Sequence, residues 1–317
     1  MNGIRAIVRK ELADHFSSYR FLILFALIAM VSLITVYMVG LNLKTELRGI
    51  AKPKFVFLLL FTSSGSLFSL VQFVAFFGPL LGLVLGFDAI NRERSEGTLS
   101  KLLSQPIYRD VVINGKFLAG VITISVMMTA IVLVITGLGL KIVGVVPGVE
   151  ELWRILIYLL ISIVYISFWL GISLLFSILF RSIATSALAA LAVWIFFSFF
   201  IPLGASVVAN SQVSQTETSD VSALVQRARI VHTITLASPL ELYTHAATII
   251  DPTRKTTRSI VAMGPMERLS LSRFSGPLSL LQSLFIVIPY IVTLIAIAVI
   301  CFGISYVVFM RQEIRSL

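Results

Sequence analysis

The side chains best suited to chemistry are concentrated between residues 88 and 116, where acidic, basic and hydroxyl groups follow one another closely. Carboxylates come first, at Glu93 and Glu96, and bases follow, at Arg109 and Lys116. Side chains in this order can form ion pairs with the surface of another protein. We therefore expect recognition, rather than catalysis, from this segment.

A short helix is expected in the middle of the segment. Gly97 should break the preceding helix, Thr98 can cap a new one, and Pro106 should end it. Three leucines give this helix one apolar edge: Leu99, Leu102 and Leu103. The pattern predicts an apolar ridge with acids before it and bases after it, and a solvated loop is the alternative.

The sequence lacks the motifs of nucleotide, metal and hydrolytic sites. Gly115-Lys116 is followed by Phe117, and Asp110 stands where a P-loop needs its first glycine. A metal site built from His232, His245 and Asp251 is disfavoured because lone loop histidines are usually solvated. Cys301 is the single cysteine, so a disulfide within the chain and zinc sites with two cysteines are excluded. We expect no catalytic residue, no metal and no cofactor bound by this chain.

The composition of the chain predicts which helices position the charged segment. Of 317 residues, 58% are hydrophobic and 13% are charged, and the mean hydropathy is +1.00, whereas a soluble domain carries about 25% charged residues. Six stretches without Asp, Glu, Lys, Arg or His are long enough to cross a bilayer: 21–40, 66–87, 117–140, 155–180, 183–209 and 281–310. The sequence predicts an all-α membrane protein with six transmembrane helices in a single domain spanning 1–317.

Basic residues predict the orientation. With both termini in the cytoplasm, twelve of the 25 Lys and Arg residues lie on the cytoplasmic side and six lie in the short outer loops. This distribution favours a multi-pass protein of the cell membrane with cytoplasmic termini. Because the basic residues flank apolar stretches rather than form a stripe, nucleic acid is not expected as a partner.

Two flanking segments have helical patterns of their own. Residues 1–20 predict an amphipathic helix in the lipid headgroup plane, and an unstructured basic flank is the alternative. In the outer loop, residues 210–280, Ser238, Pro239 and Glu241 predict a capped helix that Asp251 ends. We expect that helix to act as a lid or to pack on the membrane surface, ahead of forming a substrate site.

The run from Glu93 to Lys116 resembles the signature of permeases of exporter-type ABC transporters, the ABC-2 type family: an acidic residue, Gly-Thr, paired leucines, Pro-Ile and a downstream Gly-Lys. Arg9-Lys10-Glu11-Leu12 resembles the Lys-Glu-Leu entry of that family, and Phe180-Arg181-Ser182 resembles its short turn between spans four and five. One subgroup, the permease of nitrous oxide reductase maturation, shares the signature and a sizeable outer loop.

The resemblance implies a half-transporter with an N-terminal elbow helix at 1–20, a coupling helix within 88–116 and an extracytoplasmic loop at 210–280. A separate cytosolic ATPase subunit would bind ATP and Mg, and a second permease subunit, identical or paralogous, would complete a dimer. The resemblance assigns ATPase coupling to Glu93, Arg94, Glu96, Gly97, Thr98, Leu102, Leu103, Pro106, Arg109 and Lys116. It assigns the elbow to Arg5, Arg9, Lys10 and Glu11, of which Arg5, Lys10 and Glu11 would hold the elbow against the coupling segment.

Three functions are weighed. A transport subunit driven by a separate ATPase is favoured, because the six apolar stretches carry no ionisable residue with which to capture energy themselves. The alternative is a non-translocating subunit that relays ATPase-driven motion to an extracytoplasmic protein. An intramembrane enzyme is disfavoured, because the stretches offer neither a nucleophile with its base nor a metal pair. The substrate stays open, and membrane lipids are expected partners in every case.

Overall fold

The computed structural model describes residues 2–46, 55–62, 69–98, 108–212, 221–251 and 277–312, and all the secondary structure in these ranges is helical. Six helices are long and apolar enough to cross a membrane: Tyr19–Thr45, Leu70–Ser95, Arg109–Val143, Val149–Leu179, Ile183–Gln212 and Leu280–Arg311. They coincide with the six predicted stretches, so the prediction of an all-helical chain with six candidate spans is confirmed.

The spans comprise α2 (Tyr19–Glu46), α4 (Leu70–Gly86) followed by α5 (Asn91–Ser95), α7 (Arg109–Val143), α8 (Val149–Leu179), α9 (Ile183–Ile195), and α15 (Leu280–Arg311). After α9, the fifth span continues through a π-helical turn, η2 (Phe196–Phe200), into α10 (Ile201–Gln212). The shorter helices are α1 (Asn2–Ser17), η1 (Val56–Leu58), α3 (Leu59–Thr62), α11 (Val221–Thr235), α12 (Pro239–Ala246) and η4 (Ala247–Ile250).

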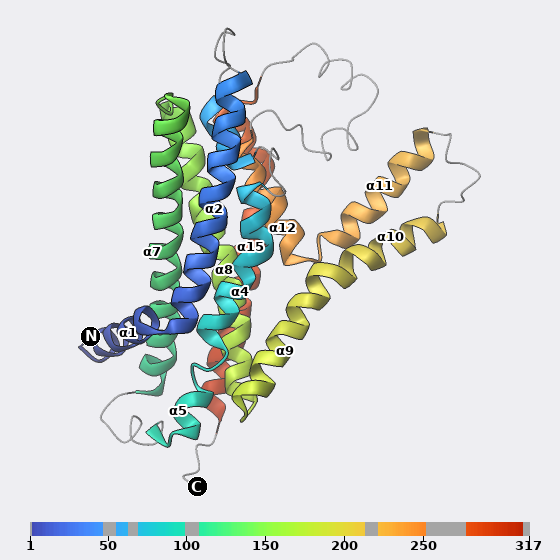
Figure 1. The fold of residues 1–317 in the computed structure, drawn as a ribbon. Helices are drawn as coiled ribbons and strands as arrows, with labels where there is room; N and C mark the ends of the chain where they lie inside the picture. Colours follow the sequence, from blue (N-terminus) through green and yellow to red (C-terminus); the bar gives the residue numbers. More distant parts are fainter. Residues whose placement is uncertain are drawn as a thin grey trace.

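Helix α8 is the centre of the bundle, and it packs most closely on α4 and α15. Close packing with α4 depends on Gly82, where an added Cβ would lie 2.5 Å from the carbonyl oxygen of Ile166 on α8. The continuous helix α9–η2–α10 leans away from the bundle, and α11 returns along α10 (Figure 1). Helix α1 lies across one end of the bundle (Figure 1), which we call the α1 end; α5 and the last turn of α15 lie at the same end.

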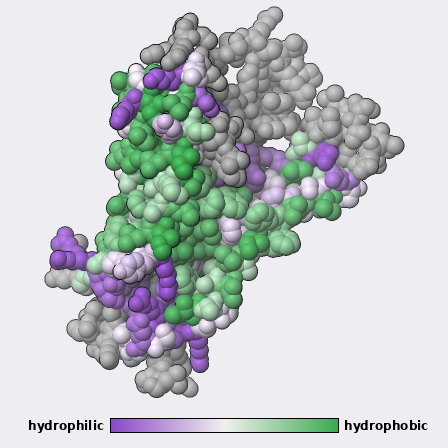
Figure 2. Space-filling view, in the orientation of Figure 1, coloured by the Kyte–Doolittle hydropathy of each residue, from purple (hydrophilic) through white to green (hydrophobic). Residues whose placement is uncertain are grey.

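On the face that Figure 2 shows, an apolar belt covers the middle of the bundle, and hydrophilic residues gather toward its two ends. Large apolar side chains stay exposed on α9, α10 and α15, as at Leu188, Leu203 and Phe285. Such exposure is unfavourable in water and favourable against lipid chains. The surface therefore agrees with the composition in predicting a bilayer as the solvent of these helices.

Helix α12 begins where the sequence predicts but packs elsewhere. Ser238 is its N-cap residue and Pro239 occupies its first turn, yet the predicted capping box is not formed, because the Ser238 hydroxyl donates to the carbonyl of Phe197 in η2 at 2.8 Å. Tyr243 is fully buried, and its hydroxyl lies 2.9 Å from that of Ser162 on α8. The expectation of a helix lying on the membrane surface is therefore wrong for α12, which packs one face against the bundle; a role as a lid stays a prediction.

An ion cluster at the α1 end

A glycine brings α1 against α7. An added Cβ at Gly115 would lie 2.7 Å from Cγ2 of Ile7, so any larger residue would push α1 away. Ile7 belongs to a small apolar core at this end, formed with Ile90, Val112, Ile113, Leu174, Ile178 and Phe309. Glu11 follows Ile7 by one helical turn and Lys116 follows Gly115 directly, so the close contact sets these two charged residues side by side.

Four charged residues meet there and form what we call the ion cluster: Lys10, Glu11, Glu93 and Lys116. The Lys116 ammonium donates to Oε1 of Glu11 at 2.8 Å and to Oε1 of Glu93 at 3.0 Å. The Lys10 ammonium reaches the same two oxygens, at 3.3 Å for Glu11 and 3.1 Å for Glu93. Two cations and two carboxylates balance, which is the condition under which charges tolerate burial. The cluster joins α1, α5 and α7.

Burial differs sharply within the cluster. The side chain of Lys116 is 4% exposed, and those of Glu11 and Glu93 are similarly buried, whereas that of Lys10 is 52% exposed. Burial opposes ionisation of Glu11, but the nearby cations, Lys116 first and Lys10 after it, together outweigh burial and hold the pKa of Glu11 below its ordinary value. Burial likewise opposes the charge on Lys10, yet Glu11 and Glu93 raise its pKa. Both shifts favour the ionised forms, so the contacts persist at neutral pH.

A second network ties the same region to the last span. Arg94 donates to the side-chain oxygen of Gln312 at 2.7 Å, and Arg109 donates to its backbone carbonyl at 3.2 Å. The side-chain nitrogen of Gln312 donates in turn to the carbonyl of Ile178 on α8 at 3.2 Å. The start of α7, the end of α8 and α5 are thus held at the C-terminal end of α15.

The break predicted at Gly97 is present. Helix α5 ends at Ser95, and Gly97 has φ +67°, in the left-handed region that glycine adopts most readily. Glu96, Gly97 and Thr98 are exposed, so they are accessible to a partner. Leu102, Leu103 and Pro106 lie outside the described residues, and the short helix expected there stays a prediction.

The structure thus divides the residues that the sequence singled out. It brings Lys10, Glu11, Glu93 and Lys116 together. The residues by themselves indicated only separate segments, whereas the family resemblance implied that Lys10 and Glu11 hold the elbow against the coupling segment. Arg5 and Arg9 of the elbow segment are exposed and do not reach the ion cluster. Contact of these residues with an ATPase stays a prediction.

Sequence reasoning did not single out Arg154, which it counted only as one of the six basic residues of the short outer loops. Arg154 is fully buried at the opposite end of the bundle from α1. It donates to the carbonyl of Ile249 at 2.7 Å, to that of Leu278 at 2.8 Å and to the hydroxyl of Ser283 at 3.1 Å, and it pairs with Glu150 at 2.9 Å. The signal available was the four-residue spacing of Glu150 and Arg154 at a helix start. The fourth span therefore carries buried charge in its first turns.

Two of the histidines lie next to each other in the structure. His232 on α11 and His245 on α12 place their rings 4.9 Å apart, edge to face, and the His245 ring stacks on Tyr290. Within the described ranges, no group of three or more His, Cys, Asp or Glu residues could hold a metal ion.

Comparison with known proteins gives two findings. The model of a family described as "ABC-2 family transporter protein" matches residues 5–314, nearly the whole chain. The chain is also similar to the probable ABC transporter permease protein NosY of Stutzerimonas stutzeri, with 31% identity over 117 residues. That alignment covers 37% of this chain and 38% of NosY, so it spans well under half of the relative's length.

Proposed function

The chain belongs to the ABC-2 family of transporter proteins as a permease subunit, and from this premise we propose how it works. Two such subunits, identical or paralogous, pair in the cell membrane. A separate cytosolic ATPase subunit binds ATP and Mg and hydrolyses the nucleotide. Its motion switches the paired permeases between two states and so exports an unidentified substrate or moves it across the membrane.

The observation that carries this proposal is the ion cluster. Because it joins α5 to α1 and α7 through short contacts between buried groups, a displacement of α5 is passed to both helices. The exposed residues Glu96, Gly97 and Thr98 would contact the ATPase together with the leucine ridge at 99–103. Glu93, by contrast, is buried and would transmit motion rather than touch the partner.

The second network extends the same role to the last span. Arg94 and Arg109 hold Gln312, so motion of α5 also reaches α15. The α1 end would face the cytoplasm, which agrees with the excess of basic residues predicted for that side. Both termini are then cytoplasmic, and the α11–α12 segment lies toward the outer side.

Two charge changes distinguish residues that bind the ATPase from residues that pass its motion to the helices. The permease is co-expressed with the genes that neighbour its own. Co-purification of an ATPase subunit is then measured in detergent, and ATP hydrolysis is measured in proteoliposomes. We expect Glu96→Lys to weaken association. We expect Glu93→Gln to keep association but to abolish the stimulation of ATP hydrolysis by the permease. Lys141→Glu, at the other end of α7, is the matched control and should change neither.

Two outcomes would contradict the proposal. If no ATPase co-purifies with the wild-type chain, the proposal that a separate ATPase drives this permease fails. If the ATPase binds and both Glu93→Gln and Glu96→Lys behave as the control does, the α1 end is not the coupling surface.

One observation favours a second candidate, a subunit that relays motion to an extracytoplasmic protein without translocation. The paired helices α10 and α11 lean out of the bundle (Figure 1), so a partner could reach them. A photo-crosslinking residue at position 227 would distinguish the two. Specific capture of one extracytoplasmic protein, lost when the ATPase is inactive, would favour the relay.

A further inference from the structure

We propose that the exposed face of α1 binds the headgroup phosphate of an anionic phospholipid in the adjoining leaflet, chiefly through Arg5 and Arg9. The inference concerns the side of α1 that faces away from the ion cluster. It does not depend on ATP hydrolysis or on the identity of the transported substrate.

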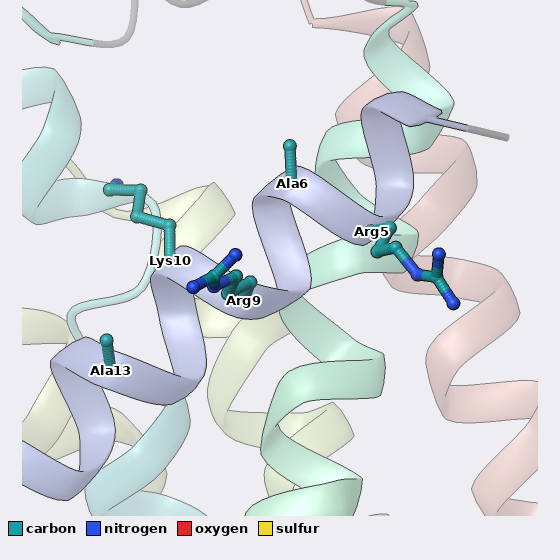
Figure 3. A pocket seen from close by; sticks show the side chains of 5 residues that line it. All are labelled: Arg5, Ala6, Arg9, Lys10 and Ala13. Atoms are coloured by element: carbon teal, nitrogen blue, oxygen red, sulfur yellow. The ribbon is translucent and has the colours of Figure 1, made fainter.

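The face has the shape of a shallow basic hollow. It has a volume of about 620 Å³ and is lined by Arg5, Ala6, Arg9, Lys10 and Ala13. Ala6 and Ala13 leave space along one side of α1, and the longer side chains of Arg5, Arg9 and Lys10 extend from the same stretch of the helix in different directions (Figure 3). Among the residues that the structure describes, no acidic residue lines the hollow. A phosphate group could therefore approach the helix without meeting negative charge.

The two arginines are available for such a ligand. Arg5 and Arg9 are exposed, and among the described residues neither forms an ion pair with a carboxylate. They are four residues apart on one helix, which places their Cβ atoms about 6 Å apart on the same face. Guanidinium groups bind phosphate oxygens through paired hydrogen bonds, so two of them at this spacing can hold one headgroup.

Lys10 has a different role. Its ammonium lies 3.1 Å from Glu93 and 3.3 Å from Glu11, and Asp14 lies 3.9 Å away. Its charge is therefore already shared with carboxylates, and it extends along α1 in the opposite direction from Arg5 (Figure 3). Lys10 closes one side of the hollow but adds little net attraction, so the arginines decide the affinity.

The position of α1 selects a lipid as the occupant. The helix lies across the end of the spans (Figure 1), and α2 enters the apolar belt from Tyr19, two residues after α1 ends. Phe16 and Tyr19 are exposed beside this junction, and aromatic rings are enriched at the level of lipid headgroups. A basic face at that level meets the negative surface of anionic lipids.

The test compares lipid binding by two variants of the full chain. The purified protein is mixed with equal amounts of phosphatidylglycerol and phosphatidylcholine, and the bound lipids are counted by native mass spectrometry. Each basic side chain near an anionic surface contributes a factor of about five in affinity, so R5Q/R9Q should lower the preference for phosphatidylglycerol roughly 30-fold. The matched control R227Q/R229Q removes two exposed arginines from α11 and should leave the preference unchanged.

Further arms separate other sources of the same chemistry. R5K/R9K keeps the charge and should retain most of the preference, and added salt should weaken it in the wild type, which tests the proposal even if R5Q/R9Q fails to fold. An equal loss in both glutamine variants would overturn it. The proposal would also be overturned if inorganic phosphate alone stabilised the protein as much as phosphatidylglycerol does. It would be overturned as well if R5Q/R9Q kept the lipid preference but no longer bound the ATPase, because that result would assign this face to the ATPase.

Discussion

Replacing Lys116 by Met is the sharpest perturbation of the ion cluster, because it removes the most buried charge while keeping a side chain of similar length. The change leaves the carboxylates of Glu11 and Glu93 without the ammonium that lies 2.8 Å and 3.0 Å from them. At an effective dielectric constant of about 20, each contact represents roughly 5 kcal/mol of Coulomb energy, and desolvation offsets much of it.

The net cost follows from burial. Removing one partner of a buried ion pair destabilises a protein by about 3–5 kcal/mol. Because Lys10 still reaches both carboxylates and is half exposed, we expect the lower part of that range, about 3 kcal/mol. Adding Glu11→Gln to the Lys116→Met variant should recover part of the loss, since it removes one of the stranded charges, and the two effects will not add.

The assay measures two quantities in the same detergent: the free energy of unfolding, and hydrogen exchange of the α1 amides. Arg20→Gln is the matched control, because Arg20 pairs with Asp88 at 3.1 Å at the same end but is 64% exposed. An exposed pair of this kind contributes about 0.2–1 kcal/mol. We expect faster exchange in α1 for Lys116→Met and almost none of this effect for Arg20→Gln.

A loss of less than about 1 kcal/mol for Lys116→Met, equal to that of the control, would refute the reasoning. Unchanged exchange in α1 would do so as well, because the cluster would then not hold α1 against α7.

Three further predictions follow from other contacts. Acid should loosen α1. Burial lowers the pKa of His15 below 6.5, and the cations around Glu11 lower its pKa below 4.5 despite its burial. Both groups take up protons less readily in the folded state than in the unfolded state, so stability falls as the pH drops below 6.5 and again below 4.5. The melting temperature should decline below about pH 6.5, and His15→Gln should flatten the upper part of that decline. Gly82→Val should destabilise the bundle by about 3 kcal/mol or more, the upper end of the usual cost of overpacking, because the added Cβ meets the backbone of α8. Gly137→Ala is the control: no atom lies within 4 Å of an added Cβ there, so the same thermal melt should change little. Arg154→Met should cost roughly 3 kcal/mol by leaving the buried carbonyl of Ile249, the part-buried carbonyl of Leu278 and the Ser283 hydroxyl without their donor. Unfolding measurements that find a loss of less than about 1 kcal/mol would contradict the role of Arg154 in joining η4, α8 and α15.

Much of the architecture could be predicted because lipid imposes a simple rule on the sequence. About 20 apolar residues are needed to cross the hydrocarbon, so the six spans were readable by length and composition alone. The same local rules located the break at Gly97 and the start of α12 at Ser238. Such features depend on residues adjacent in the chain, and their physics does not require a fold.

The candidate site was readable only in part. The charged segment and the elbow segment were identified separately, and the resemblance to a family linked them. That Glu93 is buried while Glu96 is exposed could not be deduced, because both are acids three residues apart on one short stretch. Their difference arises from α1 and α7, which contribute Lys10 and Lys116 to one side of α5 only.

By itself, the sequence determined the solvent of this protein, the number of its spans and the segment that carries its charge, since apolar length and local turn chemistry decide these. Only the tertiary structure decided that α1 packs closely against α7 at Gly115 and that four charges from three helices neutralise one another. It also decided that Arg154 and one face of α12 are buried. Burying a charge or a polar helix face is favourable only where partners converge on it, and convergence of residues 83 or 105 positions apart is a property of packing.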